Sequence, residues 1–187
     1  MTVPTGQKAK MLAGELYLAT DPQLVAEDRR AQELLFRFNQ TPPGADDERR
    51  ALLAELFNSF APGAVLRPSF RCDYGSNISI GEDSFVNYDC VFLDCNRITI
   101  GREVQIAPRV QIYTATHPLD AATRRAKLEF ALPVVIEDGA WLGGGAVVCP
   151  GVTIGANTVV GAGSVVTRDL PPGVLAVGNP CRVLRTL

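Results

Sequence analysis

One histidine, His117, is the side chain of this 187-residue chain best suited to moving protons near neutrality. Histidine is the only residue whose ordinary pKa lies between pH 5 and 8, which makes it an effective general base. His117 lies in the polar segment YTATHPLDAATRRAKLEFALP, which also holds two adjacent arginines. A lone histidine can equally be structural or merely exposed, so the surrounding elements must decide its role.

The five cysteines indicate no disulfide framework and no structural zinc site. They are Cys72, Cys90, Cys95, Cys149 and Cys181. Their number is odd and no pair forms a CxxC motif, whereas both kinds of site need paired spacings. We expect buried, reduced thiols that pack as small hydrophobic residues.

A six-residue hydrophobic period dominates the chain from residue 61 onward. Six aliphatic residues are spaced six apart: Ile136, Leu142, Val148, Ile154, Val160 and Val166. Small or β-branched residues follow the first five, four places later: Ala140, Ala146, Val152, Thr158 and Ser164. An earlier run repeats the pattern: Ile80, Val86, Phe92, Ile100, Ile106 and Ile112.

This period predicts a parallel β-helix, in which each unit forms one flat strand and one corner. The aliphatic residue points inward and stacks on its equivalent in the next coil, because a single coil cannot bury its own interior. Gly143, Gly155 and Gly161 directly follow three of the aliphatic residues, and we expect them to provide the turn dihedrals. The alternative is a β-sandwich with coincidental spacing, against which six consecutive matches argue.

Two interruptions of the period locate irregular segments. The spacing from Phe92 to Ile100 is eight, which predicts a two-residue bulge near Asp94 to Arg97. Between Ile112 and Ile136 the pattern lapses, which predicts a loop over about 113–133. Because loops on rigid scaffolds often carry function, the position of His117 in this loop favours a catalytic role.

The first sixty residues have a helical pattern instead, so we divide the chain into a helical segment, 1–60, and a β-helix domain, 61–187. Asp21 followed by Pro22 predicts a helix start. Its apolar face is Leu24, Ala31, Leu34, Leu35 and Phe38. Asp46 could cap a second helix, with the apolar face Leu52, Leu53, Leu56, Phe57 and Phe60. A shorter helical turn is expected around Lys8 to Leu12.

Composition argues against several classes of partner. The net charge is −2 and the pI is about 5.4, so the composition does not indicate binding to nucleic acid or to an anionic membrane, which would need a basic patch. Residues Met1 to Leu12 lack the apolar core of a signal peptide, and no stretch reaches the ~20 apolar residues of a membrane span. We therefore expect a cytoplasmic protein.

Four motifs carry a resemblance to a known family. They are MLAGELYLATDPQL, FRCDYGSNISIG, IYTATHPLD and GNPCRV, and they occur in this order. From about Ala9 to its end the chain resembles the hexapeptide-repeat sugar O-acetyltransferases, which include maltose, galactoside and nodulation acetyltransferases. Asp73 in FRCDYG is similar to the maltose branch, which is the best match, because the galactoside pattern has serine there.

The resemblance implies a mainly β protein: a left-handed parallel β-helix with an N-terminal α-helical segment. It also implies a cytoplasmic homotrimer with active sites between subunits, acetyl-CoA as the acetyl donor, a sugar hydroxyl as the acceptor and no required metal. His117 matches the catalytic base, Glu129 a carboxylate near the histidine, and Asn87 an asparagine near the thioester. Glu129 could instead be an ordinary surface residue, and Asn87 a turn former.

The resemblance also implies the substrate contacts. The acceptor positions are Asp73, Asn87, Asp94 and His117. The cofactor positions are Asn87, Trp141, Gly144, Ala162, Thr167, Arg168, Arg182 and Arg185. Arginine suits phosphate because its donors form a fork, although each of these side chains could simply be solvated. Asp73 and Asp94 could instead cap turns, and Cys95 stands where the galactoside enzyme has a second acidic residue.

Other functions of the fold remain as alternatives. The acceptor could be a galactoside, an aminosugar, serine or an antibiotic. A γ-class carbonic anhydrase needs three histidines on zinc, which one histidine per chain excludes. A non-catalytic β-helix would need neither the polar loop nor the terminal arginines.

Overall fold

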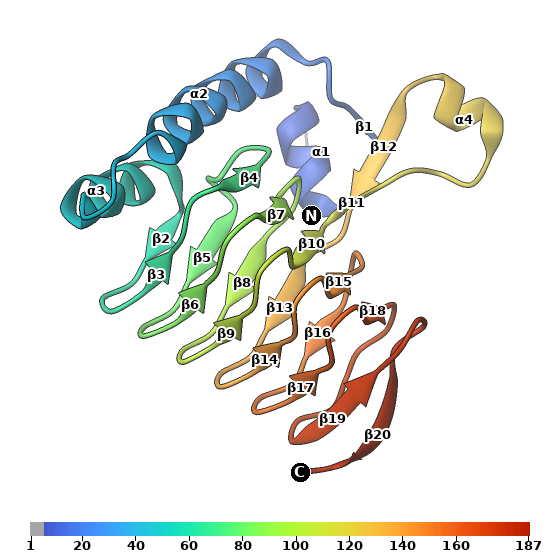
Figure 1. The fold of residues 1–187 in the computed structure, drawn as a ribbon. Coiled ribbons are helices and arrows are strands. Elements are labelled where there is room, and N and C mark those ends of the chain that lie inside the picture. The colour runs from blue at the N-terminus through green and yellow to red at the C-terminus, as the bar shows by residue number, and fades with distance from the viewer. Residues whose placement is uncertain (1–5) are drawn as a thin grey trace.

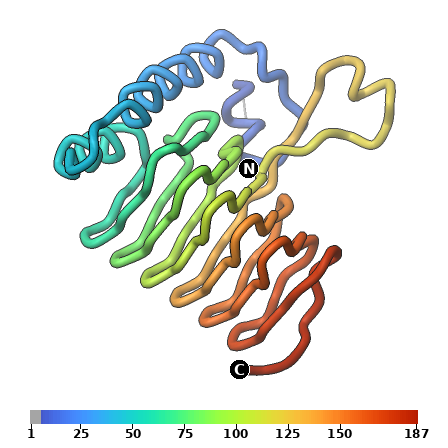
Figure 2. The backbone as a smooth tube through the Cα atoms, in the orientation of Figure 1, coloured from blue at the N-terminus to red at the C-terminus, as the bar shows by residue number. Residues whose placement is uncertain are grey.

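The computed structural model describes residues 6–187. Residues 1–5, the start of the segment Met1 to Leu12 in which we expect no signal peptide, lie outside it. Stacked coils form the body of the molecule, with helices at the N-terminal end and a hairpin at the C-terminal end (Figures 1 and 2). One segment projects sideways from the middle of the stack. Among residues 6–187, no helix has the length and apolarity that crossing a bilayer requires.

Three sheets form the three sides of this β-solenoid. Sheet I contains β2 (Ser59–Phe60), β5 (Ile78–Ile80), β8 (Ile98–Ile100), β13 (Val134–Ile136) and β16 (Thr153–Ile154). Sheet II contains β3 (Val65–Leu66), β6 (Phe85–Val86), β9 (Gln105–Ile106), β14 (Trp141–Leu142), β17 (Val159–Val160), β19 (Val174–Val177) and β20 (Arg182–Thr186). Sheet III contains β4 (Phe70–Cys72), β7 (Cys90–Leu93), β10 (Gln111–Tyr113), β15 (Val147–Val148) and β18 (Val165–Val166). All neighbours pair in parallel except β19 and β20.

The hexapeptide prediction is confirmed. Each of the twelve spaced apolar residues is at most 2% exposed, and the same residue types stack from coil to coil, as in Leu142 opposite Ile106 and Val160. The apolar interior is therefore one continuous column, which no single coil could bury.

The prediction that three glycines provide the turn dihedrals is wrong. Gly143, Gly155 and Gly161 do not have positive φ angles; the turns use other glycines, such as Gly139 (φ 69°). A Cβ at Gly143 would instead lie 2.5 Å from the Ala162 nitrogen in the next coil. These glycines are needed because successive coils approach too closely for a side chain.

The helices α2 (Pro22–Asn39) and α3 (Asp46–Leu56) cover the N-terminal end of the solenoid, and α1 (Gln7–Ala13) lies beside the stack near the base of the projecting segment. The Asp21 carboxylate accepts a hydrogen bond from the Gln23 N–H at 3.0 Å, which confirms the predicted start of α2. Its predicted apolar face is buried.

The predicted start and end of the second helix need correction. Ala45 is the N-cap, and Asp46 lies inside the first turn, where its charge favours the helix dipole. The helix ends at Leu56: Phe57 is extended and Phe60 belongs to β2, which pairs with β5. The apolar pattern continues because both aromatic rings pack on the solenoid, with Phe57 at 5.8 Å from Phe70.

The two irregular segments lie where predicted, and they meet. In the turn 94–97 the Asn96 side-chain amide donates to the Met11 carbonyl at 3.2 Å and to the Ala131 carbonyl at 2.9 Å. The turn thus anchors both α1 and the projecting segment. That segment is more ordered than a loop: it contains β11 (Ala115–Thr116), α4 (Ala121–Arg125) and β12 (Leu128–Ala131).

Candidate active site

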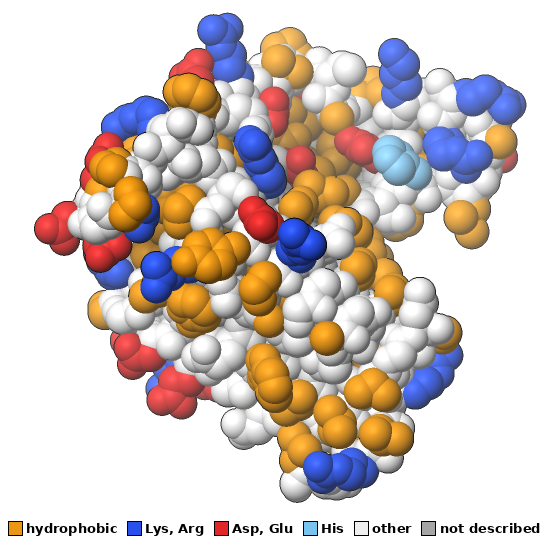
Figure 3. Space-filling model, in the orientation of Figure 1, with side chains coloured by type: hydrophobic (Ala, Val, Ile, Leu, Met, Phe, Trp, Pro, Cys, Tyr) orange, Lys and Arg blue, Asp and Glu red, His pale blue; other side chains and the backbone are white. Residues whose placement is uncertain are grey.

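A small antiparallel sheet carries His117. We call it the outer sheet; its order is β1 (Tyr17–Leu18), β12, β11. Thr116 on β11 pairs with Phe130 on β12, so the next position brings His117 opposite Glu129. The His117 Nε2 lies 3.8 Å from the Glu129 Oε2, within ion-pair range but longer than a hydrogen bond. Figure 3 shows the one histidine in pale blue beside an acidic side chain, at the base of the projecting segment.

The tip of the projecting segment is held by local hydrogen bonds. Asp120 caps α4 and accepts from the Thr123 hydroxyl and from the Thr123 N–H, each at 2.7 Å, and these two hydrogen bonds lower the pKa of its carboxyl. The Arg124 guanidinium donates to the Pro118 carbonyl at 2.9 Å. His117 therefore lies between the end of β11 and a turn that is held by hydrogen bonds, and its side chain is 59% exposed.

Two of the predicted acceptor-binding carboxylates lie at one corner of the solenoid, between sheets III and I. We call this the III–I corner; it comprises residues 73–77, 94–97, 114–133, 149–152 and 167–169. Asp73 is half-buried and accepts from the Cys95 thiol at 3.3 Å, and burial raises the pKa of its carboxyl.

Asp94 has the contacts of a turn-forming residue. It is fully buried and accepts from the backbone N–H groups of Asp73 at 3.0 Å, Tyr74 at 2.8 Å and Asn77 at 3.2 Å. Burial raises the pKa of its carboxyl to about 6, against the lowering effect of the backbone N–H groups of Tyr74, Gly75 and Asn77. Of its two expected roles, the contacts favour the turn; its role in acceptor binding stays a prediction.

The prediction of buried thiols is confirmed for four of the five cysteines, whereas Cys149 is half-buried; all five are free. Burial raises the pKa of the Cys95 thiol, so this residue stays protonated and donates to Asp73.

Within residues 6–187, no cluster of three or more histidine, cysteine or acidic side chains is arranged to hold a metal.

Asn87 and three cofactor candidates lie elsewhere. Asn87 follows β6, Gly144 follows β14 and Ala162 follows β17, all at the corner between sheets II and III, which we call the II–III corner. The Asn87 side-chain oxygen accepts from the Tyr88 N–H at 2.8 Å, as a turn former would. Trp141 lies on the outer face of sheet II and is 53% exposed.

The remaining cofactor candidates are exposed near the C-terminal end. Thr167 and Arg168 follow β18 at the III–I corner, and Arg182 and Arg185 lie on β20. Arg182 donates to the Cys181 carbonyl at 2.8 Å, and Arg185 to the Thr186 carbonyl at 3.1 Å. Each guanidinium has five N–H donors, so these bonds leave others for an anion.

The structure brings some of the predicted residues together and separates others. His117 and Glu129 meet in the outer sheet, next to the corner that holds Asp73. Asn87, Gly144 and Ala162 lie at a different corner of the triangular coil. Two residues near the first group were not assigned contacts from the sequence: Tyr17, opposite Glu129, and Asn96, which anchors the segment. Both roles depend on pairing between distant segments.

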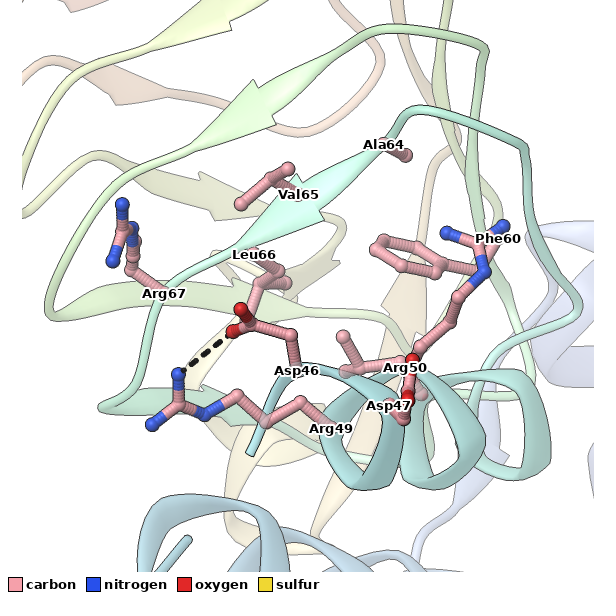
Figure 4. A pocket seen from close by; sticks show the side chains of 10 residues that line it. Asp46, Asp47, Arg49, Arg50, Phe60, Ala64, Val65, Leu66 and Arg67 are labelled. Carbon is pink, nitrogen blue, oxygen red and sulfur yellow. Dashed lines mark hydrogen bonds and ion pairs between the residues drawn. The ribbon is translucent and has the colours of Figure 1, made fainter. Parts of the chain in front are cut away.

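A cavity of about 350 Å³ lies away from these residues, between α3 and β3 (Figure 4). Two of the three arginines that line it already have partners. Arg49 donates to the Thr41 hydroxyl at 2.7 Å and pairs with Asp46, while Arg50 lies over the Phe60 ring at 5.4 Å. We assign no chemistry to this cavity.

The stacked six-residue coils and the histidine-bearing projection define the class of hexapeptide-repeat proteins. The maltose acetyltransferase hexapeptide capping motif matches residues 10–61, and the bacterial transferase hexapeptide, with six repeats, matches residues 133–168. Nodulation protein L of Rhizobium meliloti (strain 1021) is 51% identical over 177 residues, which cover 95% of this chain and 97% of that protein.

Two solved structures are similar over nearly the whole chain. A maltose O-acetyltransferase from Clostridium difficile 630 is 48% identical with a TM-score of 0.98, and the match covers 99% of each chain. A hexapeptide-repeat acetyltransferase from Vibrio cholerae O1 biovar eltor, complexed with acetyl-CoA, is 42% identical with a TM-score of 0.91, covering 98% and 99%. The chain therefore belongs to the hexapeptide-repeat acetyltransferase family.

Proposed function

We propose that this acetyltransferase moves the acetyl group of acetyl-CoA to a hydroxyl of a maltose- or glucose-like sugar, with His117 as the general base. One observation carries the proposal: an exposed imidazole lies 3.8 Å from a mostly buried carboxylate on a braced sheet. The acetyl-CoA complex of the Vibrio cholerae relative supports the donor, and the maltose O-acetyltransferase relative supports the acceptor class.

The reaction needs a base because a neutral alcohol is a weak nucleophile. His117 takes the hydroxyl proton as the acceptor oxygen bonds to the acetyl carbonyl carbon. The carbon–sulfur bond then breaks, and the proton passes to the departing sulfur of CoA. Glu129, whose side chain is only 16% exposed, orients the imidazole and stabilises its charged form.

The donor, acetyl-CoA, lies along the cofactor candidates. Exposed Trp141 and Ala162 line a groove for the pantetheine, and the Gly144 N–H stabilises the oxyanion or holds the thioester. Asn87 contacts both substrates near the reacting carbon. Thr167, Arg168, Arg182 and Arg185 hold the phosphates and adenine of CoA. No metal takes part.

The site is shared between subunits of a homotrimer. In one chain the base and the Asn87–Gly144–Ala162 group lie at different corners of the coil. Packing the III–I corner of one chain against the II–III corner of the next brings the two groups to one cleft. Three-fold symmetry then builds three identical sites.

The acceptor contacts complete the proposal. Asp73 and Asn87 accept hydrogen bonds from sugar hydroxyls beside His117; we retain Asp94 as a weaker candidate. The N-terminal helical segment, which contains α1 to α3, closes the acceptor pocket against the solenoid. The runner-up function is acetylation of another small acceptor by the same residues, such as a galactoside, an aminosugar, serine or an antibiotic.

A screen of acceptors tests the proposal. Sugars, small alcohols and amines are incubated with acetyl-CoA and the protein, and released thiol is followed. The proposal expects glucose- or maltose-like sugars to give the highest kcat/KM. Preference for an amine or an amino acid would replace the sugar acceptor with the runner-up.

A further inference from the structure

The hydroxyl of Tyr17 is buried without a hydrogen-bond partner among the described residues. The Tyr17 side chain is 0% exposed and belongs to a small core with Leu24, Tyr74 and Cys95. A buried polar group without a partner is costly, so proteins rarely retain one without a use. A phenylalanine would fill the same space without this cost. The hydroxyl therefore calls for an explanation beyond packing.

The register of the outer sheet points to the partner. Tyr17 on β1 lies directly opposite Glu129 on β12. Directly opposed residues in an antiparallel pair have side chains on the same face, with Cβ atoms about 5 Å apart. On the other side of Glu129, the register of β11 continued by one residue leads to His117, whose Nε2 lies 3.8 Å from the Glu129 Oε2. Glu129 is thus the middle member of a row that runs Tyr17, Glu129, His117.

Of the groups that face the Tyr17 hydroxyl, the Glu129 carboxylate is the strongest acceptor. The other is Cys95, whose thiol gives its only proton to Asp73 and whose sulfur is a weak acceptor. Burial, followed by the neighbouring Cys95 and Glu129 side chains, raises the pKa of Tyr17 far above its usual range. The phenol therefore keeps its proton and acts only as a neutral donor. A carboxylate is the strongest acceptor that such a donor can find.

We propose that Tyr17 is a positioning residue: its hydroxyl donates to the Glu129 carboxylate and holds that carboxylate toward His117. The inference rests on the proposed role of His117 as the base. The N-terminal segment then takes part in the chemistry, because Tyr17 on β1 acts on His117 through its hydrogen bond to Glu129. The contact aligns the imidazole without touching either substrate.

A double-mutant cycle tests the proposal. Tyr17→Phe keeps the ring and removes the hydroxyl, and Glu129→Gln keeps the shape and removes the charge. We expect each change to lower kcat by about tenfold, in keeping with one charge-assisted hydrogen bond, with little change in KM for acetyl-CoA. In the Glu129→Gln background, Tyr17→Phe should have little further effect, because the group it acts through is gone.

Leu24→Val is the matched control. It removes one methylene from the same small core, so it reduces stability without removing a polar group. We expect it to lower Tm and leave kcat unchanged. If Leu24→Val and Tyr17→Phe lowered kcat equally, the hydroxyl would have only a packing role and the proposal would fall. Additive effects of Tyr17→Phe and Glu129→Gln would overturn it as well.

A second readout does not depend on turnover. Because His117 is the only histidine, its imidazole gives one set of C–H signals in an NMR spectrum. Tyr17→Phe should move these signals in the wild-type background and leave them in place in the Glu129→Gln background. Unmoved signals in Tyr17→Phe would overturn the proposal even if His117→Ala were inactive. If His117→Ala kept full activity, the proposed base would fail separately.

Discussion

At the scale of single residues, the exposure of His117 and the burial of Glu129 fit the two roles that we propose for them. In the proposed mechanism the imidazole must reach a substrate hydroxyl, which its 59% exposure allows, whereas the carboxylate needs only a fixed place beside it. Their 3.8 Å separation leaves room for the pair to tighten when substrates bind, as catalytic hydrogen bonds often do. Exposure also makes His117 removable without damage to the core.

The first prediction concerns the base. His117→Ala should lower kcat by about 10²–10⁴-fold, the usual contribution of general-base catalysis. Acetyl-CoA binding should remain nearly intact, because the imidazole does not hold the donor. Steady-state kinetics at saturating acetyl-CoA, with a good acceptor, measure the change.

Arg125→Ala is the control for that change, since Arg125 is an exposed residue of the same projecting segment. It should keep wild-type kcat. Activity of His117→Ala within a few-fold of wild type would mean that histidine is not the base.

The second prediction concerns the donor. Arg182→Ala should raise KM for acetyl-CoA roughly ten- to hundredfold, because a hydrogen bond to a charged group contributes ~1.5–3 kcal/mol. KM for the sugar should change much less. Arg29→Ala, at an exposed ion pair on α2, is the control. Equal changes in both KM values would make Arg182 a structural residue.

At the scale of elements, the III–I corner depends on buried polar groups. Asp94 holds the turn 73–77 through three backbone N–H groups, and Asn96 ties α1 and β12 to the coil. These contacts position the outer sheet against the solenoid. The coils themselves depend on a different feature, the close approach of their backbones at glycines.

The third prediction concerns the pH dependence of stability. Burial raises the pKa of Asp94 from its usual value near 3.8 to about 6, so the folded chain holds this proton more tightly than the unfolded chain. The resulting stabilisation is fully present below pH ~4 and is lost as pH rises through about 6. Two pKa units correspond to on the order of 3 kcal/mol.

Asp94→Asn removes this ionisation and isolates its effect. The free energy of unfolding of wild type, minus that of the variant, should fall between about pH 4 and pH 6 and then level off. Denaturant unfolding at a series of pH values measures it. A difference that is independent of pH would show that Asp94 does not titrate in this range.

The fourth prediction concerns coil stacking. A Cβ at Gly155 would lie 2.4 Å from the Pro172 nitrogen, so Gly155→Ala should destabilise the fold by roughly 1–3 kcal/mol. Thermal unfolding reports the loss as a lower Tm. Gly6→Ala, where a Cβ meets nothing within 4 Å, should have a smaller effect. An unchanged Tm for Gly155→Ala would mean that the coils can separate without cost.

At the scale of the whole molecule, the triangular cross-section separates the proposed base from much of the proposed donor site. The segment with His117 projects from one corner (Figure 1), while Asn87 and Gly144, which follow β6 and β14, lie at another. A small movement of the projecting segment would not carry His117 from its own corner to the corner that holds Asn87 and Gly144. Association of chains is the direct way to bring the two groups together.

The fifth prediction concerns this assembly. Light scattering should give about three times the 20.1 kDa chain mass. Asn87→Ala and His117→Ala chains, each inactive alone, should regain part of the activity after mixed refolding, because some shared sites then hold both native residues. A fully active monomer, or mixed trimers without activity, would refute a site between subunits.

The sequence alone determined the repeating architecture and its interruptions. A period of six needs only local information, since each unit contributes one inward residue and one corner. The same local information predicted the start of α2 and the segment that carries His117. It did not predict the end of α3, because Phe57 and Phe60 keep a helical spacing while their backbone already joins the solenoid.

Only the tertiary structure decided which distant residues meet. Tyr17 lies opposite Glu129 through strand pairing across more than a hundred residues, and neither position marks the other in the sequence. The contacts of Asp94 likewise depend on the turn 73–77 that it holds in the neighbouring coil. Spacing along a chain predicts which face a residue occupies, whereas the register between non-adjacent strands arises only when the core closes.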